Sequence, residues 1–489
     1  MTAVAAPRVL HAAADLGPGL ITEIARGRGV RITPGLRDVV RERCQQAREV
    51  LRQGAPVYGV NTGMGALSGI RLTEQQQRSH QRNLLLARAT GGPPWLDPAE
   101  VRALIAVRLR TFLSGDAGVS ADLCQRLADL LDEGIIPAVP RDGSGSAGEI
   151  IPLAHAFGPL AGIGQVLGAD GATHPAAAAL RERGLEVFTL GPKEGIALLA
   201  GVPGATALSV LRAAEAGQLA HRMEAAAALS IVAARAPADP YQPECARGDD
   251  VLGGVLGRIR QAIGTVAEPG HLQAATSFRV AGPVLAHLLR AREGLVAAAG
   301  RALDGVTDSP AFLAGRFVGT AGFHGIDLSA CCDQLTAALT HAAEVSAARI
   351  HRLLDPAVTG LPAQLARTPG PDTGLVTVHK RAAGEVHAMR RLTLPAAVGL
   401  IETSAGQEDV QSFAWEAAES LRQALHRAAA VTACELLTAY QAIALSGRPG
   451  PAGCQDVLAM LAAVIGPIEK DRLFGADIGR LAAARWPAQ

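Results

Sequence analysis

The stretch VPRDGSGSAGEIIPLAH occupies residues 139–155, and its small residues are compatible with more than one structure. Gly143, Gly145 and Gly148 have the G-x-G-x-x-G spacing of a dinucleotide-binding loop. Such a loop follows a β-strand, but the preceding sequence, GIIPAVPRD, contains two prolines that interrupt any strand. A flexible linker is disfavoured too, because the apolar sequence EIIPLAHAFGPLAGIG follows directly. The rest of the chain therefore decides what this stretch does.

Long helical runs dominate the second half of the chain, where alanine, leucine and arginine are frequent. Residues 205–236 contain no proline and one glycine, which predicts a helix on the order of 45 Å long. Residues 327–354, with Asp327 as the N-cap, and residues 411–445 predict two more. Small and apolar residues occur on more than one side of these helices, and a single chain seldom buries all of them. We therefore predict a mainly α-helical homo-oligomer.

Glycine and proline interrupt the first 200 residues more often, at GVNTGMGALSG, TGGPPWLDP and PAVPRDGSGSAG. Loops of this kind commonly carry functional residues on a rigid scaffold. The sequence therefore predicts an N-terminal domain over residues 1–200, followed by a region of long bundled helices and C-terminal helices over residues 201–489.

The composition argues against several classes of partner. Of 489 residues, 49% are hydrophobic and 19% are charged, with a net charge of +1, so neither nucleic acid nor an anionic membrane is an expected partner. The N-terminus lacks the pattern of a secretory signal, and no membrane span is expected. The seven cysteines form no C-x-x-C pair and the thirteen histidines form no H-x-x-x-H pair. We therefore predict no metal site and a reduced, cytoplasmic protein.

With these features in view, VPRDGSGSAGEIIPLAH resembles the signature of the aromatic amino acid lyases, which comprise histidine, phenylalanine and tyrosine ammonia-lyases and related aminomutases. Six other segments resemble this family in the same order: VYGVNTGMG (57–65), QRNLLLARATGG (81–92), GPKEGIALLAG (191–201), SFR (277–279), GFHG (322–325) and QED (407–409). Each match alone is weak, but the ordered set is specific. The resemblance implies a histidine/phenylalanine ammonia-lyase-like fold. In that fold, long parallel helices form the central bundle of a homotetramer, and three subunits build each active site.

The resemblance also implies a prosthetic group, methylidene-imidazolone (MIO), which forms from an internal Ala-Ser-Gly. The amide nitrogen of the third residue attacks the carbonyl group of the first, and the serine loses its hydroxyl group. Matched without gaps on PLAH, the three positions are Ser146, Ala147 and Gly148. Alanine has no hydroxyl group to eliminate, so we expect no MIO in this register. Registers centred on Ser146 or Ser144 are the alternatives.

Three matched residues imply roles toward a substrate. Tyr58 resembles the family's general base, which removes the β-proton, whereas a buried tyrosine with a satisfied hydrogen bond is the alternative. Asn61 resembles a substrate-orienting residue, or else it shapes the NTG turn. Arg279 resembles the arginine that binds the substrate carboxylate, because its planar fork suits bidentate pairing. A salt bridge at a surface or subunit interface is the alternative for Arg279.

Other matched positions are retained or lost. Glu408 resembles an acid that lines the family's site, with a helix cap as the alternative. Phe323 and His324 match residues of the substrate site, with packing and loop geometry as the alternative. Four polar residues of the family are replaced, by Ala200, Thr276, Pro283 and Gly322. These positions normally hydrogen-bond the prosthetic group or the departing amine, so their loss favours a protein without MIO.

Substrate selectivity in this family resides largely in two adjacent residues, which here are Ala87 and Arg88. The pairs that suit tyrosine, phenylalanine and histidine contain no arginine. If Arg88 faces the pocket, it favours an anionic or strongly polar substrate group. Arg110, which replaces an asparagine of the family, is expected to add to the same positive field.

These residues predict a divergent enzyme of the ammonia-lyase fold that works without MIO. It would act on a carboxylate-bearing small molecule derived from an amino acid, held by Arg279 with selectivity from Arg88. Tyr58 would transfer the proton in an elimination, isomerisation or cyclisation. A conventional ammonia-lyase or aminomutase with a shifted MIO is one alternative, and a non-catalytic binding paralogue is the other.

Overall fold

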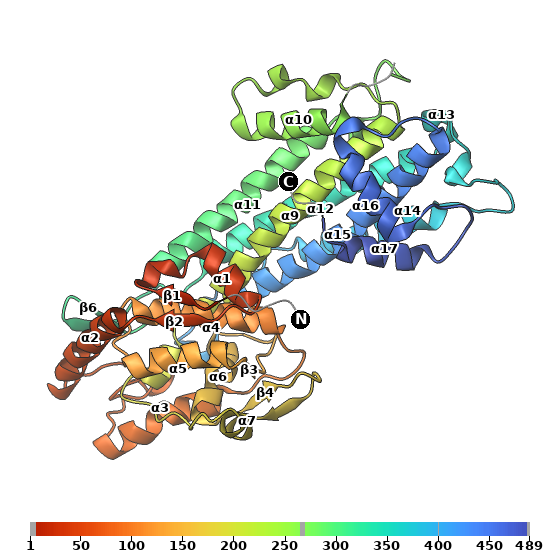
Figure 1. Cartoon of the computed structure of the whole chain (residues 1–489). Helices are drawn as coiled ribbons and strands as arrows, with labels where there is room; N and C mark the ends of the chain where they lie inside the picture. Colours follow the sequence, from red (N-terminus) through yellow and green to blue (C-terminus); the bar gives the residue numbers. More distant parts are fainter. Residues whose placement is uncertain (1–5, 265–268, 400, 487–489) are drawn as a thin grey trace. The chain divides into compact units, whose positions relative to one another are not determined.

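The computed structural model describes residues 6–264, 269–399 and 401–486, and these residues are mainly helical (Figure 1). The four longest helices in this part of the chain are α9 (Pro203–Ala233), α11 (Ala281–Asp304), α12 (Ile326–Leu353) and α15 (Ala414–Ser446). The long helices predicted from the sequence correspond to α9, α12 and α15, so these predictions are confirmed. The prediction that Asp327 is an N-cap is wrong, because α12 begins one residue earlier and places Asp327 in its first turn.

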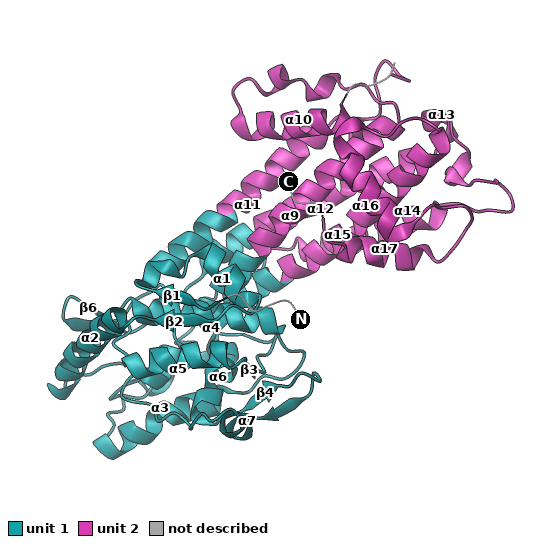
Figure 2. Cartoon of the chain, viewed as in Figure 1, with its two compact units in different colours: residues 1–211, 295–332, 396–419 teal, residues 212–294, 333–395, 420–489 magenta. Residues whose placement is uncertain are grey.

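The chain forms two compact units, each built from three separate segments (Figure 2). Unit 1 comprises Met1–Leu211, Leu295–Cys332 and Ala396–Glu419, and unit 2 comprises Arg212–Gly294, Asp333–Pro395 and Ser420–Gln489. This arrangement differs from the predicted division into residues 1–200 and 201–489. The reason is that α9, α11, α12 and α15 each begin in one unit and end in the other, so the chain crosses between units along its helices.

Unit 1 combines short helices with three small β-sheets. Its shorter helices are α1 (Pro18–Ala25), α2 (Pro34–Arg52), α3 (Glu74–Arg88), α4 (Pro98–Leu113), α5 (Ala121–Asp132), α6 (Ile150–Phe157), α7 (Ala176–Glu182) and α8 (Glu194–Leu199). The strands are the parallel pair β1 (Arg8–Leu10) and β2 (Val30–Ile32), the antiparallel sheet β3 (Ile136–Pro137), β4 (Gln165–Leu167) and β5 (Thr173–Pro175), and the antiparallel pair β6 (Ala311–Leu313) and β7 (Arg316–Val318). No sheet among the described residues exceeds three strands, so helices make most of the core.

Helix α4 lies at the centre of unit 1, and every side chain from Glu100 to Arg110 is buried. Buried arginines need hydrogen-bond acceptors, and backbone carbonyls supply them here. Arg102 donates to the carbonyls of Ile24 and Leu131, each at 2.7 Å. Arg110 donates to three carbonyl groups and pairs with Asp304. Arg110 is therefore a structural residue, and the expectation that it adds to the field of the substrate pocket is wrong.

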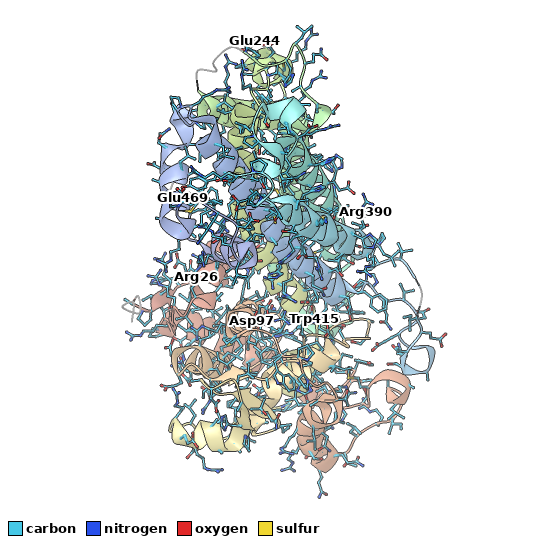
Figure 3. All side chains as sticks on the ribbon, turned by 90° about the vertical axis from the view of Figure 1, so that its right-hand side faces the viewer. Arg26, Asp97, Glu244, Arg390, Trp415 and Glu469 are labelled. Carbon is cyan, nitrogen blue, oxygen red and sulfur yellow. The ribbon has the colours of Figure 1, made fainter. Side chains whose placement is uncertain are left out.

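Trp415 anchors the start of α15 in unit 1 (Figure 3). Its indole N–H donates to the carbonyl oxygen of Arg141 at 2.7 Å, and the side chain is fully enclosed. The Arg141 guanidinium in turn pairs with Glu100 of α4 at 2.7 Å and with Glu419 of α15 at 3.0 Å. These contacts fix the backbone that leads into the stretch VPRDGSGSAGEIIPLAH.

Helices α3 and α8 approach each other closely at Gly195. A Cβ atom at Gly195 would lie 2.2 Å from the backbone oxygen of Gln81. The Gln81 side chain also joins the two segments, because its amide donates to the Gly59 carbonyl at 3.0 Å and accepts from the Ile196 N–H at 3.2 Å. The loop that carries Tyr58 is thereby tied to α3 and α8.

Substituting Gly195→Ala should therefore lower the free energy of unfolding by about 1–3 kcal/mol, because backbone atoms cannot move aside cheaply. Chemical denaturation would measure this loss. Gly19→Ala in α1 is the matched control, because a Cβ there meets nothing within 4 Å. We expect the control to be neutral or slightly stabilising. Equal effects of the two substitutions would contradict the close approach of α3 and α8.

Unit 2 is a helical bundle. Parts of α9, α11, α12 and α15 run alongside one another, and α10 (Asp250–Ile263), α13 (Pro356–Thr359), α14 (Val376–Leu392), α16 (Gln455–Ile465) and α17 (Phe474–Ala483) complete it (Figure 1). A polar cluster lies in its core and links α9, α12 and α15. We call its members, Ser230, Ser346, Arg349 and Glu435, the Glu435 network; each is at most 3% exposed.

Two segments are long and apolar enough to cross a membrane by length and composition, Glu194–Ala233 and Ala414–Ser446. Their most apolar windows are 94% and 72% buried inside the structure. Burial of this kind is typical of core helices, which pass the same test. The sequence-based expectation of no membrane span rested on the absence of such stretches, so it stays a prediction.

Candidate active site

Tyr58 lies in a tight loop between α2 and α3. Its hydroxyl oxygen accepts a hydrogen bond from the Gly65 N–H at 2.7 Å, which joins two parts of the same loop. Gly59 has a φ of 66°, and a Cβ there would lie 2.1 Å from the Ile196 side chain, so this turn requires glycine. The hydroxyl group keeps the capacity to donate a proton or a hydrogen bond to a bound molecule.

Asn61 is turned into the same loop and is 6% exposed. Its side-chain oxygen accepts from the Val57 N–H at 2.8 Å, and its amide donates to the Ala55 carbonyl at 2.8 Å. Arg71 also donates to this oxygen at 3.3 Å. These bonds use the side chain to shape the turn, which is the second of its two predicted roles, and Asn61 does not line the cavity.

A cavity of about 460 Å³ opens beside Tyr58 in unit 1. It is lined by Tyr58, Met64, Gly65, Ala66, Ala87, Arg88, Gly145, Ser146, Ile150, Ile151, Thr403, Ser404 and Glu408. Five residues predicted from the sequence therefore meet here: Tyr58, Ala87, Arg88, Ser146 and Glu408. They come from four separate segments of the chain, and the volume suits a small molecule.

Arg88 is the last residue of α3, and its side chain reaches into the cavity. Burial lowers the pKa of Arg88, while the nearby charges of Tyr58 and Glu408 raise it. His80, about two helical turns earlier, has its pKa lowered by burial and by the charge of Arg88. Arg88 is the one cationic side chain among the residues that line the cavity, and a guanidinium is not deprotonated in proteins.

Glu408 contacts the stretch VPRDGSGSAGEIIPLAH directly. Its Oε2 accepts from the Ala147 N–H at 3.0 Å and from the Thr403 hydroxyl at 3.1 Å. Ser146 is used locally: its hydroxyl donates to the Gly148 carbonyl at 3.0 Å and accepts from the Ile150 N–H at 3.4 Å, where α6 begins. Glu408 is thus a residue of the cavity wall, and in this structure it caps no helix.

Comparison with known proteins agrees with this geometry. The model of the aromatic amino acid lyases matches residues 16–464 of the chain. This chain belongs to the aromatic amino acid lyase family. The histidine ammonia-lyase of Symbiobacterium thermophilum is 31% identical over 477 residues, covering 95% of this chain and 94% of that protein. The histidine ammonia-lyase of Streptomyces griseus is 34% identical over 457 residues, covering 88% and 89%.

Solved structures of two other enzymes have the same fold. The tyrosine aminomutase of Streptomyces globisporus matches with a TM-score of 0.91 at 27% identity, covering 97% of this chain and 96% of that chain. The ergothionase of Treponema denticola matches with a TM-score of 0.91 at 23% identity, covering 97% and 98%, a likeness of fold alone. The predicted ammonia-lyase-like fold is confirmed, and the chain is an enzyme of a lyase family.

The residues at the family's MIO positions do not fit the prosthetic group in the gap-free register. Ala147, in the middle position, is 8% exposed, and its side chain is a methyl group with no oxygen to lose. Its N–H is held by Glu408, and the Ser146 hydroxyl is held by Gly148 and Ile150. Ser144, the other serine of the stretch, is 2% exposed.

Phe323 and His324 lie behind this stretch and do not line the cavity. A Cβ at Gly148 would lie 4.0 Å from the Phe323 Cβ, so Phe323 packs against the backbone of the family's MIO segment. The Nε2 atom of His324 is buried and has no hydrogen-bond partner among the described residues. At Gly322, a Cβ would lie 2.0 Å from the Val306 carbonyl oxygen, so the backbone leaves no room for a larger side chain here.

Arg279 belongs to unit 2, whereas every residue of the cavity belongs to unit 1. Its side chain is exposed, and it follows the short turn Thr276–Phe278. Two buried side chains hold that turn: the Tyr241 hydroxyl donates to the Phe278 carbonyl at 2.7 Å, and Arg349 donates to the Ser277 carbonyl at 3.2 Å. The backbone turn before Arg279 is therefore held in place, but Arg279 does not line the Tyr58 cavity.

Glu149 is a structural residue that the sequence did not single out. Its carboxylate accepts from the Gly204 N–H at 2.7 Å and the Ala205 N–H at 2.6 Å, at the start of α9. Burial raises its pKa to about 7, although these hydrogen bonds favour the ionised form. The sequence does show an acid directly after Gly148. From its position alone, however, this acid would be predicted to cap the N-terminus of α6 and not that of α9.

Proposed function

We propose that this chain is a divergent lyase-family enzyme that works without MIO. Its substrate would be a small, carboxylate-bearing molecule derived from an amino acid. Tyr58 would take a proton from the carbon next to the reacting centre, and elimination, isomerisation or cyclisation would follow. In an elimination, the electron pair of the broken C–H bond would form the new double bond while the departing group leaves with the pair of its own bond. In an isomerisation or cyclisation, this pair would form the new bond of the product, so no electrophile from the protein is required.

One observation carries this proposal: Ala147 occupies the position of the reactive serine, while Tyr58, Arg88 and Glu408 still line one cavity. The Ala147 N–H is directed to Glu408, so the segment is ordered around a carboxylate. A tyrosine, a carboxylate and a guanidinium that line one small cavity are typical of a functional site.

The cavity supplies the other requirements of proton abstraction. Removal of a proton next to a carboxylate builds negative charge, which the positive field of Arg88 in the same cavity would stabilise. The hydrogen bond from Gly65 holds the Tyr58 oxygen at the cavity wall. Ile150 and Ile151 give one wall an apolar surface that limits the access of water.

We further propose that the active protein is a homotetramer. Arg279 belongs to unit 2 and is not among the residues that line the cavity, and the family resemblance implies that three subunits build each active site. The long helices of unit 2 offer the surfaces for such assembly. A cytoplasmic location is consistent with seven cysteines that are all free in the structure.

Intact mass spectrometry of the full-length chain tests the absence of MIO. We expect a mass equal to that of the translated sequence. MIO formation would lower the mass by two water molecules, and that result would overturn the proposal. It would support a conventional lyase with a shifted register, which the position of Ser146 in the cavity wall favours as the second candidate. Ser144→Ala and Ser146→Ala would then identify the serine that reacts.

A turnover panel separates the enzyme from a non-catalytic paralogue. Amino acids and their N-methylated, hydroxylated and side-chain acidic derivatives would be incubated with the full-length chain, and products would be followed by mass spectrometry. We expect conversion of at least one carboxylate-bearing compound. Binding without conversion across the panel would contradict an enzymatic role.

A further inference from the structure

We propose that the substrate carries a second anionic group on its side chain, and that Arg88 binds this group. The inference rests on the proposed function, because that function supplies the carboxylate-bearing substrate. It concerns the same cavity and adds the chemical class of the molecule that enters it.

The Arg88 guanidinium is half-buried and lacks good acceptors. Its two polar contacts are the Leu84 carbonyl and the Met64 sulfur, each at 3.4 Å. Hydrogen bonds from N–H to oxygen are usually about 2.9–3.0 Å long, and a thioether is a weak acceptor. Among the residues that the structure describes, no carboxylate forms a salt bridge with Arg88. Its donors therefore remain available to a ligand.

Other arginines of unit 1 set the standard for comparison. Arg102 donates three hydrogen bonds to backbone carbonyls, at 2.7, 2.7 and 2.9 Å. Arg110 donates to three carbonyls at 2.9–3.2 Å and pairs with Asp304. Arg102 and Arg110, which serve the fold, thus have close acceptors. Arg88 differs because its two contacts are long and its side chain lines the cavity, where a bound molecule can satisfy its donors.

Glu408 does not neutralise Arg88, although it lines the same cavity. Its Oε2 is engaged by the Ala147 N–H and the Thr403 hydroxyl, which hold the carboxylate against the wall. The cavity consequently presents a fixed carboxylate and an unpaired guanidinium at separate positions. An anionic group of a ligand would form the close ion pair that Arg88 lacks, whereas a neutral side chain would leave this half-buried cation with only the nearby charge of Glu408.

The surroundings of Arg88 define the group further. Ala87 is small, and Ile150 and Ile151 are apolar, so little in this wall competes with a ligand for hydrogen bonds. A pair of opposite charges is stronger in such a setting than in water. The planar fork of arginine suits a carboxylate, a sulfonate or a phosphonate, which share two acceptor oxygens on one centre.

Binding of matched ligands tests the inference. We would measure dissociation constants by calorimetry for 4-carboxyphenylalanine against 4-carbamoylphenylalanine, and for glutamate against glutamine. Each pair differs chiefly in the charge of one group. For the unmodified, full-length protein, we expect the anionic member of at least one pair to bind about 10- to 100-fold more tightly, as a charge-assisted hydrogen bond provides. Sulfonate and phosphonate analogues of the preferred member would then compare the oxyanion classes.

Substitutions at two arginines of α3 test whether Arg88 causes the preference for anionic ligands. Arg88→Met should abolish it, Arg88→Lys should retain part of it, and Arg82→Met should leave it unchanged. Arg82 is exposed on the same helix and outside the cavity wall, so its substitution removes the same charge from the same element. Thermal melting would establish that each variant is folded. If Arg88→Met does not fold, Arg88→Lys alone tests the preference.

Three results would overturn the inference: no anionic ligand binding more tightly than its neutral partner, a preference that survives in both Arg88 variants, or an equal loss in Arg82→Met. The readout is binding and not turnover. Detection of MIO, or absence of conversion, would therefore defeat the proposed function while leaving the measured charge preference intact.

Discussion

Substituting Tyr58→Phe should lower kcat by about 10²- to 10⁴-fold, which is the usual contribution of a positioned acid or base. The variant retains the aromatic ring and removes the one atom that faces both the cavity and the Gly65 N–H. Loss of that hydrogen bond costs about 0.5–1.5 kcal/mol of stability, too little to unfold the chain. The measurement is kcat on the substrate that the turnover panel identifies, with the melting temperature recorded in parallel.

Tyr440→Phe is the matched control for this experiment. Tyr440 lies in α15 of unit 2, outside the cavity, and the substitution removes the same hydroxyl group. We expect its kcat to stay within about twofold of the unmodified protein, as is usual for substitutions away from a site. A Tyr58→Phe variant that is folded and equally active would contradict proton transfer by Tyr58.

The long helices were predictable because their cause is local. An uninterrupted run without proline, rich in alanine and leucine, has few alternatives to a helix, and α9, α12 and α15 follow the predicted ranges within a few residues. The two compact units were not predictable in this way. They depend on how distant segments pack, and four helices continue from one unit into the other.

The candidate site also has one part that was predictable from the sequence and one part that depends on tertiary packing. The positions of Tyr58, Arg88, Ser146 and Glu408 in one cavity follow from a family resemblance that carries the whole fold with it. The hydrogen-bond partners of individual polar groups do not follow from that resemblance. Arg110 has the same chemistry as Arg88, yet nearby carbonyls and Asp304 engage it in the core. Which acceptors surround a guanidinium depends on tertiary packing, and local sequence patterns do not contain that information.

Arg279 illustrates a second limit, because elements distant in the sequence set the geometry around a residue that a motif singles out. The turn before Arg279 is held by Tyr241 and Arg349, which are distant from it in sequence. Arg349 is in turn held by the Glu435 network. Nothing in the sequence around residue 279 indicates that its geometry depends on α9, α12 and α15.

Substituting Glu435→Ala should lower the free energy of unfolding by about 3–5 kcal/mol, since it leaves the Arg349 guanidinium buried without its counter-ion. Glu435 is fully buried and accepts from Arg349 at 2.5 and 2.9 Å, from Ser230 at 2.7 Å and from Ser346 at 2.5 Å. Burial alone would lower the pKa of Arg349, but the charge and hydrogen bonds of Glu435 raise it. Chemical denaturation monitored by circular dichroism would measure the loss.

The control is Glu344→Ala, which removes a carboxylate that pairs with the exposed residue Arg390 of α14 (Figure 3). An exposed pair usually contributes about 0–1 kcal/mol, so the two single variants should differ by several-fold. The double variant Arg349→Met/Glu435→Leu should recover part of the loss, because it removes both buried charges together. Glu435→Ala costing no more than Glu344→Ala would contradict the role of the network.

If Glu435→Ala folds, its KM should rise more than its kcat falls, because Arg349 no longer fixes the turn before Arg279 and the substrate carboxylate loses a positioned partner.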